Sequence, residues 1–257
     1  MDPATLIGIL LGFLIIVVSN IMEGGNPMSL LLIAPMMLVL GTTLMVTVAG
    51  GTMIDAKNAL KSIKFAFTAK VRPASAVVPT VVALAEKARR EGLLALEDAV
   101  KEIDDPFLVK GVQMAVDGTD PDEVRDILEA ELYAKRAEDK YSAKFFGDAG
   151  AYAPTIGIIG TVMGLVHVLE NLAAPEELGH LIAGAFIATL WGVMSANVIW
   201  LPISSRLKRL NELENARMEL IIEGVAAIQA GSNPRMIAQK LTSLLPAHEQ
   251  QIDAEAA

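Results

Sequence analysis

Four long runs of apolar residues contain no Asp, Glu, Lys or Arg, and this pattern restricts the chain to a helical membrane fold. The runs lie at residues 3–22, 28–54, 149–169 and 181–203. A helix needs about 20 apolar residues to cross the hydrocarbon core of a bilayer, because each residue adds about 1.5 Å. We therefore expect an all-α polytopic membrane protein with four transmembrane helices, and we exclude a soluble globular enzyme.

The four runs are expected to pair into two helical hairpins. Residues 23–27 (Glu-Gly-Gly-Asn-Pro) suit a sharp turn, and a short loop at 170–180 separates the last two runs. The run at 28–54 is longer than a bilayer needs, so its helix should tilt or extend past the interface. The predicted segments are a transmembrane hairpin at 1–54, a helical cytoplasmic domain at 55–148, a second transmembrane hairpin at 149–203 and a helical C-terminal tail at 204–257.

The basic residues predict the orientation of the chain in the membrane. All 21 Lys and Arg residues lie in segments 55–148 and 204–257, whereas the two loops on the other side carry only Glu. Lys and Arg concentrate on the cytoplasmic side of membrane proteins. The large insert, the tail and both termini are therefore expected in the cytoplasm.

The insert is predicted to be helical, with breaks at turn residues. Apolar residues recur at helical spacing over 79–91 and 93–103, on either side of Gly92. Asp105-Pro106 and Asp120-Pro121 each pair a capping residue with proline, which is typical of a helix start.

Two long helices are expected to connect the cytoplasmic segments with the second hairpin. A charged helix that starts at Pro121 could run directly into the third apolar run, and residues 204–229 mirror it after the fourth. Residues 231–234 (Gly-Ser-Asn-Pro) should end that helix and start a short amphipathic one that reaches Leu245, whose leucines are interpreted as packing residues.

The composition argues against catalysis, cofactors and nucleic acid. The chain has no Cys, so it offers no disulfide and no Cys-ligated metal site, and its three His residues lie far apart. It lacks the glycine-rich phosphate-binding loop of nucleotide-driven machines. A formal net charge of -9 does not suit phosphate backbones. We expect no enzyme activity, no bound metal and no cofactor.

Small and polar residues mark the last two apolar runs as a packed seam. Glycines recur in the third run, small residues recur at four-residue steps in the fourth, and both runs carry hydroxyl side chains: Gly157, Gly160, Gly164, Gly184, Ala188, Gly192, Ala196, Thr155, Thr161 and Thr189. A single membrane threonine usually bonds its own helix, but several beside small residues favour close helix contact. Because no carboxylate lies in any run, a protein that conducts ions with these helices needs a partner chain to supply one.

Five segments of the chain form a recognisable pattern: 88–97 (ARREGLLALE), 153–165 (APTIGIIGTVMGL), 178–179 (LG), 185–192 (AFIATLWG) and 201–202 (LP). These segments resemble the MotA/PomA family of flagellar stator proteins, and the similarity extends over nearly the whole chain. The resemblance implies an ion-conducting subunit of the flagellar motor in the bacterial inner membrane, surrounded by lipid. It further implies that five such subunits surround two copies of a single-span partner, MotB or PomB, whose Asp binds the ion, and that they act on the rotor protein FliG.

The resemblance also implies roles for individual residues. Arg89 or Arg90, with Glu97, would face the rotor, although a solvated helix face is the plainer interpretation of these charges. The ion pathway would be lined by Thr161, Thr189 and Thr155, and conformational coupling would depend on Pro154 and Pro202. Both prolines could instead mark helix ends. Thr161 resembles the sodium-type PomA pattern, which favours sodium over the proton as the transported ion.

Three other functions remain open from the sequence. An energiser of the ExbB or TolQ type would share the ring architecture, but those relatives have three spans rather than four. A solute transporter would usually show more spans and internal repeats. A membrane scaffold without transport would tolerate loss of the hydroxyl groups of Thr161 and Thr189.

Overall fold

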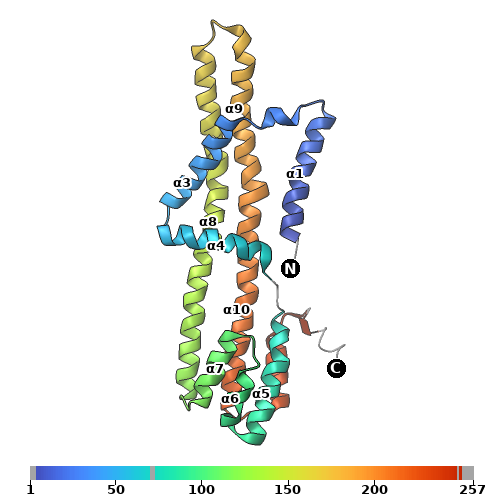
Figure 1. The fold of residues 1–257 in the computed structure, drawn as a ribbon, viewed down its shortest axis with the longest axis vertical. Coiled ribbons are helices and arrows are strands. Elements are labelled where there is room, and N and C mark those ends of the chain that lie inside the picture. The colour runs from blue at the N-terminus through green and yellow to red at the C-terminus, as the bar shows by residue number, and fades with distance from the viewer. Residues whose placement is uncertain (1–3, 70–72, 248, 251–257) are drawn as a thin grey trace. The chain divides into compact units, whose positions relative to one another are not determined.

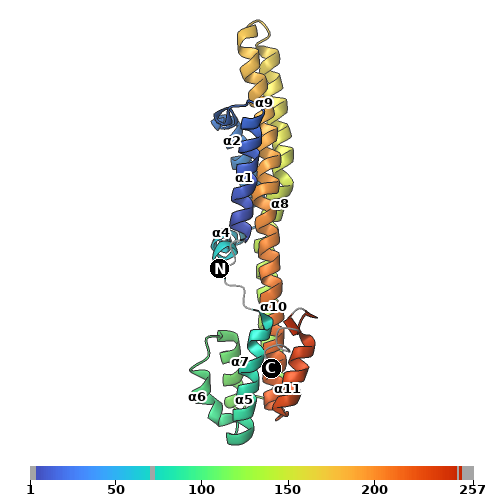
Figure 2. The same ribbon diagram turned by 90° about the vertical axis from the view of Figure 1, so that its right-hand side faces the viewer.

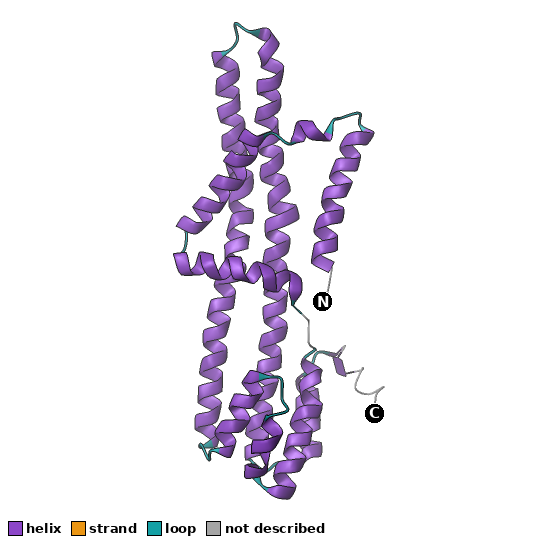
Figure 3. Cartoon of the chain, in the orientation of Figure 1, coloured by secondary structure: helices purple, strands orange, loops and turns teal. Residues whose placement is uncertain are grey.

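The computed structural model describes residues 4–69, 73–247 and 249–250, which form helices joined by turns, without a β-strand (Figure 3). The all-α class predicted from the sequence is confirmed. The chain divides into two compact units: unit 1 comprises residues 1–70 and 139–209, and unit 2 comprises residues 71–138 and 210–257. The predicted segments 55–148 and 204–257 are therefore each divided between the two units.

Unit 1 begins with α1 (Ala4–Met22), an apolar helix of 19 residues. A turn follows in which Gly24 has a φ of 82°, a backbone conformation that suits glycine. Asn26 then caps a short 3₁₀ turn, η1 (Pro27–Leu30), because its side chain accepts a hydrogen bond from the backbone N–H of Met28 at 3.0 Å. The sharp reversal expected at residues 23–27 is confirmed.

The expectation of one long helix over 28–54 is wrong. The continuous helix covers residues 33–49, as α2 (Ile33–Met36), the π-helical turn η2 (Met37–Gly41) and α3 (Thr42–Ala49). Two glycines follow, and Thr52 and Asp55 then form a capping box that starts α4 (Met53–Thr68). Hydropathy does not register such caps, so the sequence pattern overestimated the helix. The continuous helix at Ile33–Ala49 has 17 residues, which is the lower end of the lengths that cross a bilayer.

Three helices in the described part of the chain are long and apolar enough to cross a membrane: α1, α8 (Pro121–Glu170) and the continuous helix Pro175–Gln229 (Figure 1). The last one comprises α9 (Pro175–Ser195), the π-helical turn η5 (Ala196–Trp200) and α10 (Leu201–Gln229). The predicted continuity of the charged helix with the third apolar run is confirmed by α8. The connection between α8 and α9 is shorter than the expected loop at 170–180, because Pro175 already starts α9.

Two buried clusters hold unit 1 together. In the first, Trp191 of α9 packs with Val39 of η2 and donates its indole N–H to the carbonyl oxygen of Leu30 at 2.8 Å. The second joins α4 to α8 and α10, and Figure 1 shows α4 running across these two helices. Its buried members are Ala56, Ala59, Ala66, Ala143, Phe145, Phe146, Ile203 and Leu207.

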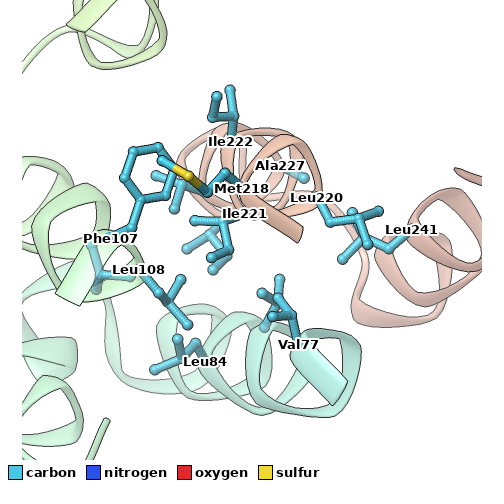
Figure 4. Close-up of a cluster of buried hydrophobic side chains, with 14 of the residues drawn as sticks. Val77, Leu84, Phe107, Leu108, Met218, Leu220, Ile221, Ile222, Ala227 and Leu241 are labelled. Carbon is cyan, nitrogen blue, oxygen red and sulfur yellow. The ribbon is translucent and has the colours of Figure 1, made fainter. Parts of the chain in front are cut away.

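Unit 2 is a helical domain built on parts of α8 and α10. It adds η3 (Ala74–Ala76), α5 (Val77–Glu91), η4 (Leu93–Ala95), α6 (Leu96–Val100), α7 (Pro106–Val116) and α11 (Pro234–Leu244). Figure 2 shows α5, α7 and α11 beside α10. Their apolar faces meet in one core, where Leu84, Leu108 and Ile221 point toward one another (Figure 4). Burial of such faces is the main favourable contribution to the stability of a small helical domain.

Capped Asx-Pro pairs begin three helices of unit 2, as the sequence predicts. In each, a carboxylate or amide oxygen accepts backbone N–H groups: Asp105 from Phe107 at 3.0 Å and Leu108 at 3.3 Å, Asp120 from Asp122 at 2.9 Å, and Asn233 from Arg235 at 3.0 Å. The helix expected over 93–103 is present but shorter: it runs from 93 to 100, as the 3₁₀ turn η4 and then α6. It ends before residue 103, since Pro106 restricts Asp105 to an extended conformation (φ -97°, ψ 104°).

Candidate functional site

The glycines of α8 and α9 let the two backbones meet without side chains between them. A Cβ atom at Gly160 would lie 2.6 Å from Cβ of Ala188, and one at Gly164 would lie 2.5 Å from Cβ of Ala185. A Cβ atom at Gly192 would lie 2.7 Å from the carbonyl oxygen of Ala153. Real Cβ atoms do not approach so closely, so these positions require glycine. We call this contact the glycine seam; it confirms the predicted close packing, except that Gly184 faces open space.

Thr161 and Thr189 lie together on the glycine seam, and their hydroxyl groups are hydrogen-bonded to each other. Thr161 Oγ1 also lies 3.2 Å from the carbonyl oxygen of Gly157 and 3.1 Å from that of Ala185. Thr189 Oγ1 lies 3.5 Å from the Gly157 carbonyl oxygen. Four oxygen atoms therefore converge from two helices, and we call them the oxygen cluster. Its two hydroxyl protons cannot serve all of these contacts at once.

The sequence predicted the two threonines but not the two carbonyl oxygens. Gly157 precedes Thr161 by four residues, the spacing at which a threonine hydroxyl bonds the carbonyl of the preceding turn, and this spacing was the available signal for the Gly157 oxygen. The Ala185 oxygen is contacted by Thr161 from the other helix, so spacing within one helix does not predict it. Thr155 does not join the cluster: its side chain is exposed and donates a hydrogen bond to the carbonyl oxygen of Tyr152 at 2.8 Å.

Both prolines lie within continuous helix. Pro154 is inside α8, and Pro202 follows the π-helical turn η5 as the second residue of α10. A proline inside a helix removes one backbone hydrogen bond and crowds the carbonyl four residues earlier. A π-helical turn before Pro202 widens the helix where that crowding falls. Neither proline ends a helix, and each lies within five residues of an end of a charge-free run.

The three charged residues predicted to face a rotor are exposed on unit 2. Arg89 and Arg90 lie in the last turn of α5, and Glu97 lies in the first turn of α6. Arg89 borders a hollow of about 400 Å³ that it shares with the N-terminus of α11, at Asn233 and Arg235. Arg90 does not line this hollow, so the structure separates two arginines that the sequence left equivalent.

The acidic neighbour of Glu97 is engaged in an ion pair. Asp98 accepts a hydrogen bond from the ammonium group of Lys101 at 2.7 Å, and this bond lowers the pKa of the Asp98 carboxyl. Leu94 lies between Arg90 and Glu97 in the sequence, and its side chain is 74% exposed. A single exposed apolar side chain is common on a protein surface, so Leu94 does not by itself mark an interface.

Ion pairs within unit 2 connect the helices behind this surface. Arg217 of α10 pairs with Asp105 at the start of α7, and both side chains are only 10% exposed. Arg217 also donates to the Glu214 carboxylate, at 3.1 Å from Nε and 2.6 Å from Nη2. A charged side chain that is this far buried requires such partners.

A second ion-pair group joins three helices of unit 2. Glu223 of α10 accepts hydrogen bonds from Arg125 of α8 at 2.7 Å and from Lys240 of α11 at 2.6 Å. The bond from Arg125 has the larger effect, and together the two bonds lower the pKa of Glu223 to about 2. The side chain of Glu223 is 25% exposed, so water screens its interactions only in part.

Comparison with known proteins gives consistent matches along the chain. It is 36% identical to motility protein A of Bacillus subtilis over 97% of this chain and 93% of that protein. It is 33% identical to chemotaxis protein PomA of Vibrio alginolyticus over 95% of this chain and 96% of that one. In the solved flagellar MotAB stator complex from Bacillus subtilis, the matching chain is 35% identical, with a TM-score of 0.89 over 96% of this chain and 98% of that one.

A family model matches as well. The model of the MotA/TolQ/ExbB proton channel family matches residues 99–220, a region that contains the glycine seam and the oxygen cluster. The relatives match nearly end to end and include both the α1–α3 region and the insert. The chain belongs to the MotA/PomA family of flagellar stator proteins, within the MotA/TolQ/ExbB proton channel family.

Proposed function

We propose that this chain is the ion-conducting subunit of a bacterial flagellar stator and that the oxygen cluster lines its ion pathway. Five copies would surround two copies of a MotB- or PomB-type partner in the inner membrane, and ion flow would drive torque on the rotor protein FliG. The observation that carries the proposal is the convergence of four oxygen atoms on the glycine seam, between helices whose apolar runs contain no charge.

The chemistry of the oxygen cluster suits a cation that has lost part of its water. Hydroxyl and carbonyl oxygens are neutral ligands for hard cations. Neutral ligands replace part of the water shell but supply no counter-charge, which a carboxylate from another chain would provide. The partner's single span would supply it. This division explains why a conducting subunit can lack an intramembrane acid.

Sodium is the proposed ion, with the proton as the alternative. Two hydroxyls and two carbonyls can replace several water ligands of sodium at once, whereas a proton needs only a chain of hydroxyls or waters. The PomA relative is similar over nearly the whole chain, as is motility protein A, so overall similarity does not separate the two ions.

The first experiment is an in-frame deletion in the source organism, scored for swimming and for flagellar filaments. We expect paralysed cells with normal filaments, rescued by the intact gene. Normal swimming with defective nutrient uptake or envelope integrity would instead favour the ExbB or TolQ alternative, once a second stator gene has been deleted too.

Valine variants of the two threonines then test the oxygen cluster. Thr161→Val and Thr189→Val keep the side-chain shape and remove the hydroxyl, and Thr155→Val is the matched control outside the cluster. If each hydroxyl contributes about 1–3 kcal/mol to ion binding, the sodium concentration that gives half-maximal swimming speed should rise by about tenfold in each variant. Swimming that persists without sodium and stops with a protonophore would assign the proton.

Arg90 and Glu97 are proposed to contact FliG. Arg90→Ala should reduce stall torque in tethered cells more than Arg89→Ala, because Arg89 borders the hollow beside α11. Glu97→Ala should do the same, with Asp98→Ala as its control, since Asp98 is already paired with Lys101. Equal effects within either pair would contradict these assignments.

Pro154 and Pro202 are proposed to couple ion passage to movement of the cytoplasmic part. Each interrupts the hydrogen bonds of a long helix, and such points bend more easily than regular helix. Pro154→Ala and Pro202→Ala should leave the chain in the membrane and lower torque at full ion supply. Unchanged torque would mean that both positions serve only packing.

The proposed topology places the insert, the tail and both termini in the cytoplasm. The chain has no Cys, so single cysteines can be introduced and labelled. With a membrane-impermeant maleimide, Leu172→Cys in the α8–α9 connection should react in intact cells. Tyr133→Cys, which is exposed on unit 2, should react only after permeabilisation. The reverse pattern would overturn the orientation.

A further inference from the structure

Helix α4 presents a basic face that its own unit does not use. Lys57, Lys61 and Lys64 are exposed, and their spacing of four and three residues aligns them on one side of the helix. Ala56 and Ala59 lie on the opposite side, where they are buried against α8 and α10. The lysines therefore point away from the bundle.

The contacts of α4 set its level along the membrane helices. The cluster that receives α4 contains Phe146 of α8 and Ile203 of η5–α10 continuous helix, and Phe146 stacks on Trp200. The third charge-free run begins at residue 149 and the fourth ends at residue 203. Helix α4 thus crosses α8 and α10 where their apolar segments end (Figure 1). That is the level of a bilayer interface, which aromatic side chains favour.

Large apolar side chains flank the lysines on both edges of the exposed face. Met53 and Leu60 are 66% and 58% exposed on one edge, and Ile54 and Phe65 are 69% and 43% exposed on the other. Exposure of such residues to water is unfavourable. A helix that combines apolar edges with lysines lies stably in an interface, where the aliphatic stems follow the acyl chains and the ammonium groups reach the headgroups.

The charges of α4 have no protein partner in the part of the chain that the structure describes. None of the three ammonium groups is in an ion pair there. The only acid of α4 is Asp55, and its carboxylate accepts hydrogen bonds from Thr52 in the capping box. The face therefore carries a net positive charge that needs an external counter-charge.

We propose that α4 is an interfacial helix that binds the headgroups of anionic lipids through Lys57, Lys61 and Lys64. The inference rests on the membrane location in the proposed function. A second copy of this chain is a less suitable occupant, because lysine is depleted from protein–protein interfaces and three like charges at the centre of a contact repel. An anionic headgroup matches the charge, and the acyl chains match the apolar edges.

Lipid retention by the intact complex tests the proposal. The full chain, purified with its partner in mild detergent, is incubated with equal amounts of phosphatidylglycerol and phosphatidylcholine, and the bound lipids are counted by native mass spectrometry. The variant K57Q/K61Q/K64Q should lose the preference for phosphatidylglycerol. Each basic residue near an anionic surface contributes about fivefold, so the ratio should fall by up to roughly a hundredfold.

The control variant K87Q/K101Q/K110Q removes the same charge from unit 2 and should keep the wild-type preference. The variant K57R/K61R/K64R should keep it too. For the wild type, the preference should weaken as salt is raised. The proposal would be overturned if K57Q/K61Q/K64Q kept the wild-type preference for phosphatidylglycerol, whether or not its subunits still assembled. If the glutamine variant does not assemble, a salt-independent wild-type preference would overturn it instead.

The two proposals can fail separately. Paralysis of the deletion strain and the valine variants at Thr161 and Thr189 test conduction, and neither depends on lipid preference. If the deletion strain swims normally and the purified complex still prefers phosphatidylglycerol, α4 remains an interfacial helix and only the stator function is overturned. A motility defect without a lipid preference would do the reverse.

Discussion

Replacing Asp105 should loosen the start of α7 by two separable effects. The side chain caps α7 through the N–H groups of Phe107 and Leu108, and it also pairs with Arg217. Loss of an N-cap costs about 1 kcal/mol. Loss of one partner from a buried pair costs about 3–5 kcal/mol, but Arg217 keeps two bonds to Glu214, so we expect about 2 kcal/mol here. Asp105→Asn removes only the pair, and Asp105→Ala removes both.

Hydrogen exchange of the α7 amides measures this loss, because they exchange when unit 2 opens locally. Asp105→Asn should speed exchange by roughly 30-fold and Asp105→Ala by roughly 150-fold, from about 2 and 3 kcal/mol. Peptides from α9 in unit 1 are the internal reference. The double variant D105N/R217M should recover part of the loss, because it removes the buried guanidinium that D105N leaves without its carboxylate, while the more exposed Glu214 loses its two bonds from Arg217. Wild-type exchange in Asp105→Asn, or equal exchange in both variants, would refute the reasoning.

Three further predictions address the seam, the second ion-pair group and a turn. Gly160→Leu should lower the thermal stability of unit 1, because overpacking costs about 1–3 kcal/mol, whereas Gly184→Leu should not. Tryptophan fluorescence measures this stability, since Trp191 and Trp200 both lie in unit 1. Glu223 has a folded-state pKa of about 2 against an ordinary 4.5, so its contribution is complete above about pH 5 and is lost as the pH falls through 4.5 toward 2. Wild type should therefore lose about 1–2 kcal/mol more than Glu223→Gln on acidification, by circular dichroism, and parallel losses would contradict the pairing. Gly92→Ala should cost about 1–3 kcal/mol, because Gly92 has a φ of 87° and a ψ of 165°, a conformation essentially restricted to glycine; unchanged exchange in α5 and α6 would contradict it.

Local signals in the sequence predicted much of the fold. The helix starts at Asp105, Asp120 and Asn233 depend on a capping side chain and a proline that are neighbours in sequence. The long α8 follows from an uninterrupted helical pattern between Pro121 and Glu170. Such features involve residues within one helical turn of each other, so no tertiary information is needed to see them.

The missed features depend on caps hidden within apolar sequence or on contacts between distant residues. Hydropathy merged residues 28–54 into one helix because Thr52 and the Gly50–Gly51 pair scarcely change the average. The meeting of Thr161 with Thr189 requires the register of α8 against α9, which periodicity does not give. The ion pair between Arg217 and Asp105 joins residues that are remote in sequence, so no local pattern predicts it.

The glycine seam also determines how the α8–α9 hairpin can deform. Where two backbones touch, no rotamer change can absorb a sliding motion, so the stretch from Gly157 to Gly164 must move with α9 as one body. The close contact ends at Ala185, because the neighbouring Gly184 faces open space. Close contact therefore holds the hairpin at residues 157–164, and no such contact exists at Gly184, which lies nearer the connection at 171–174. The oxygen cluster lies in the closely packed part, where thermal motion disturbs the spacing of the ligands least.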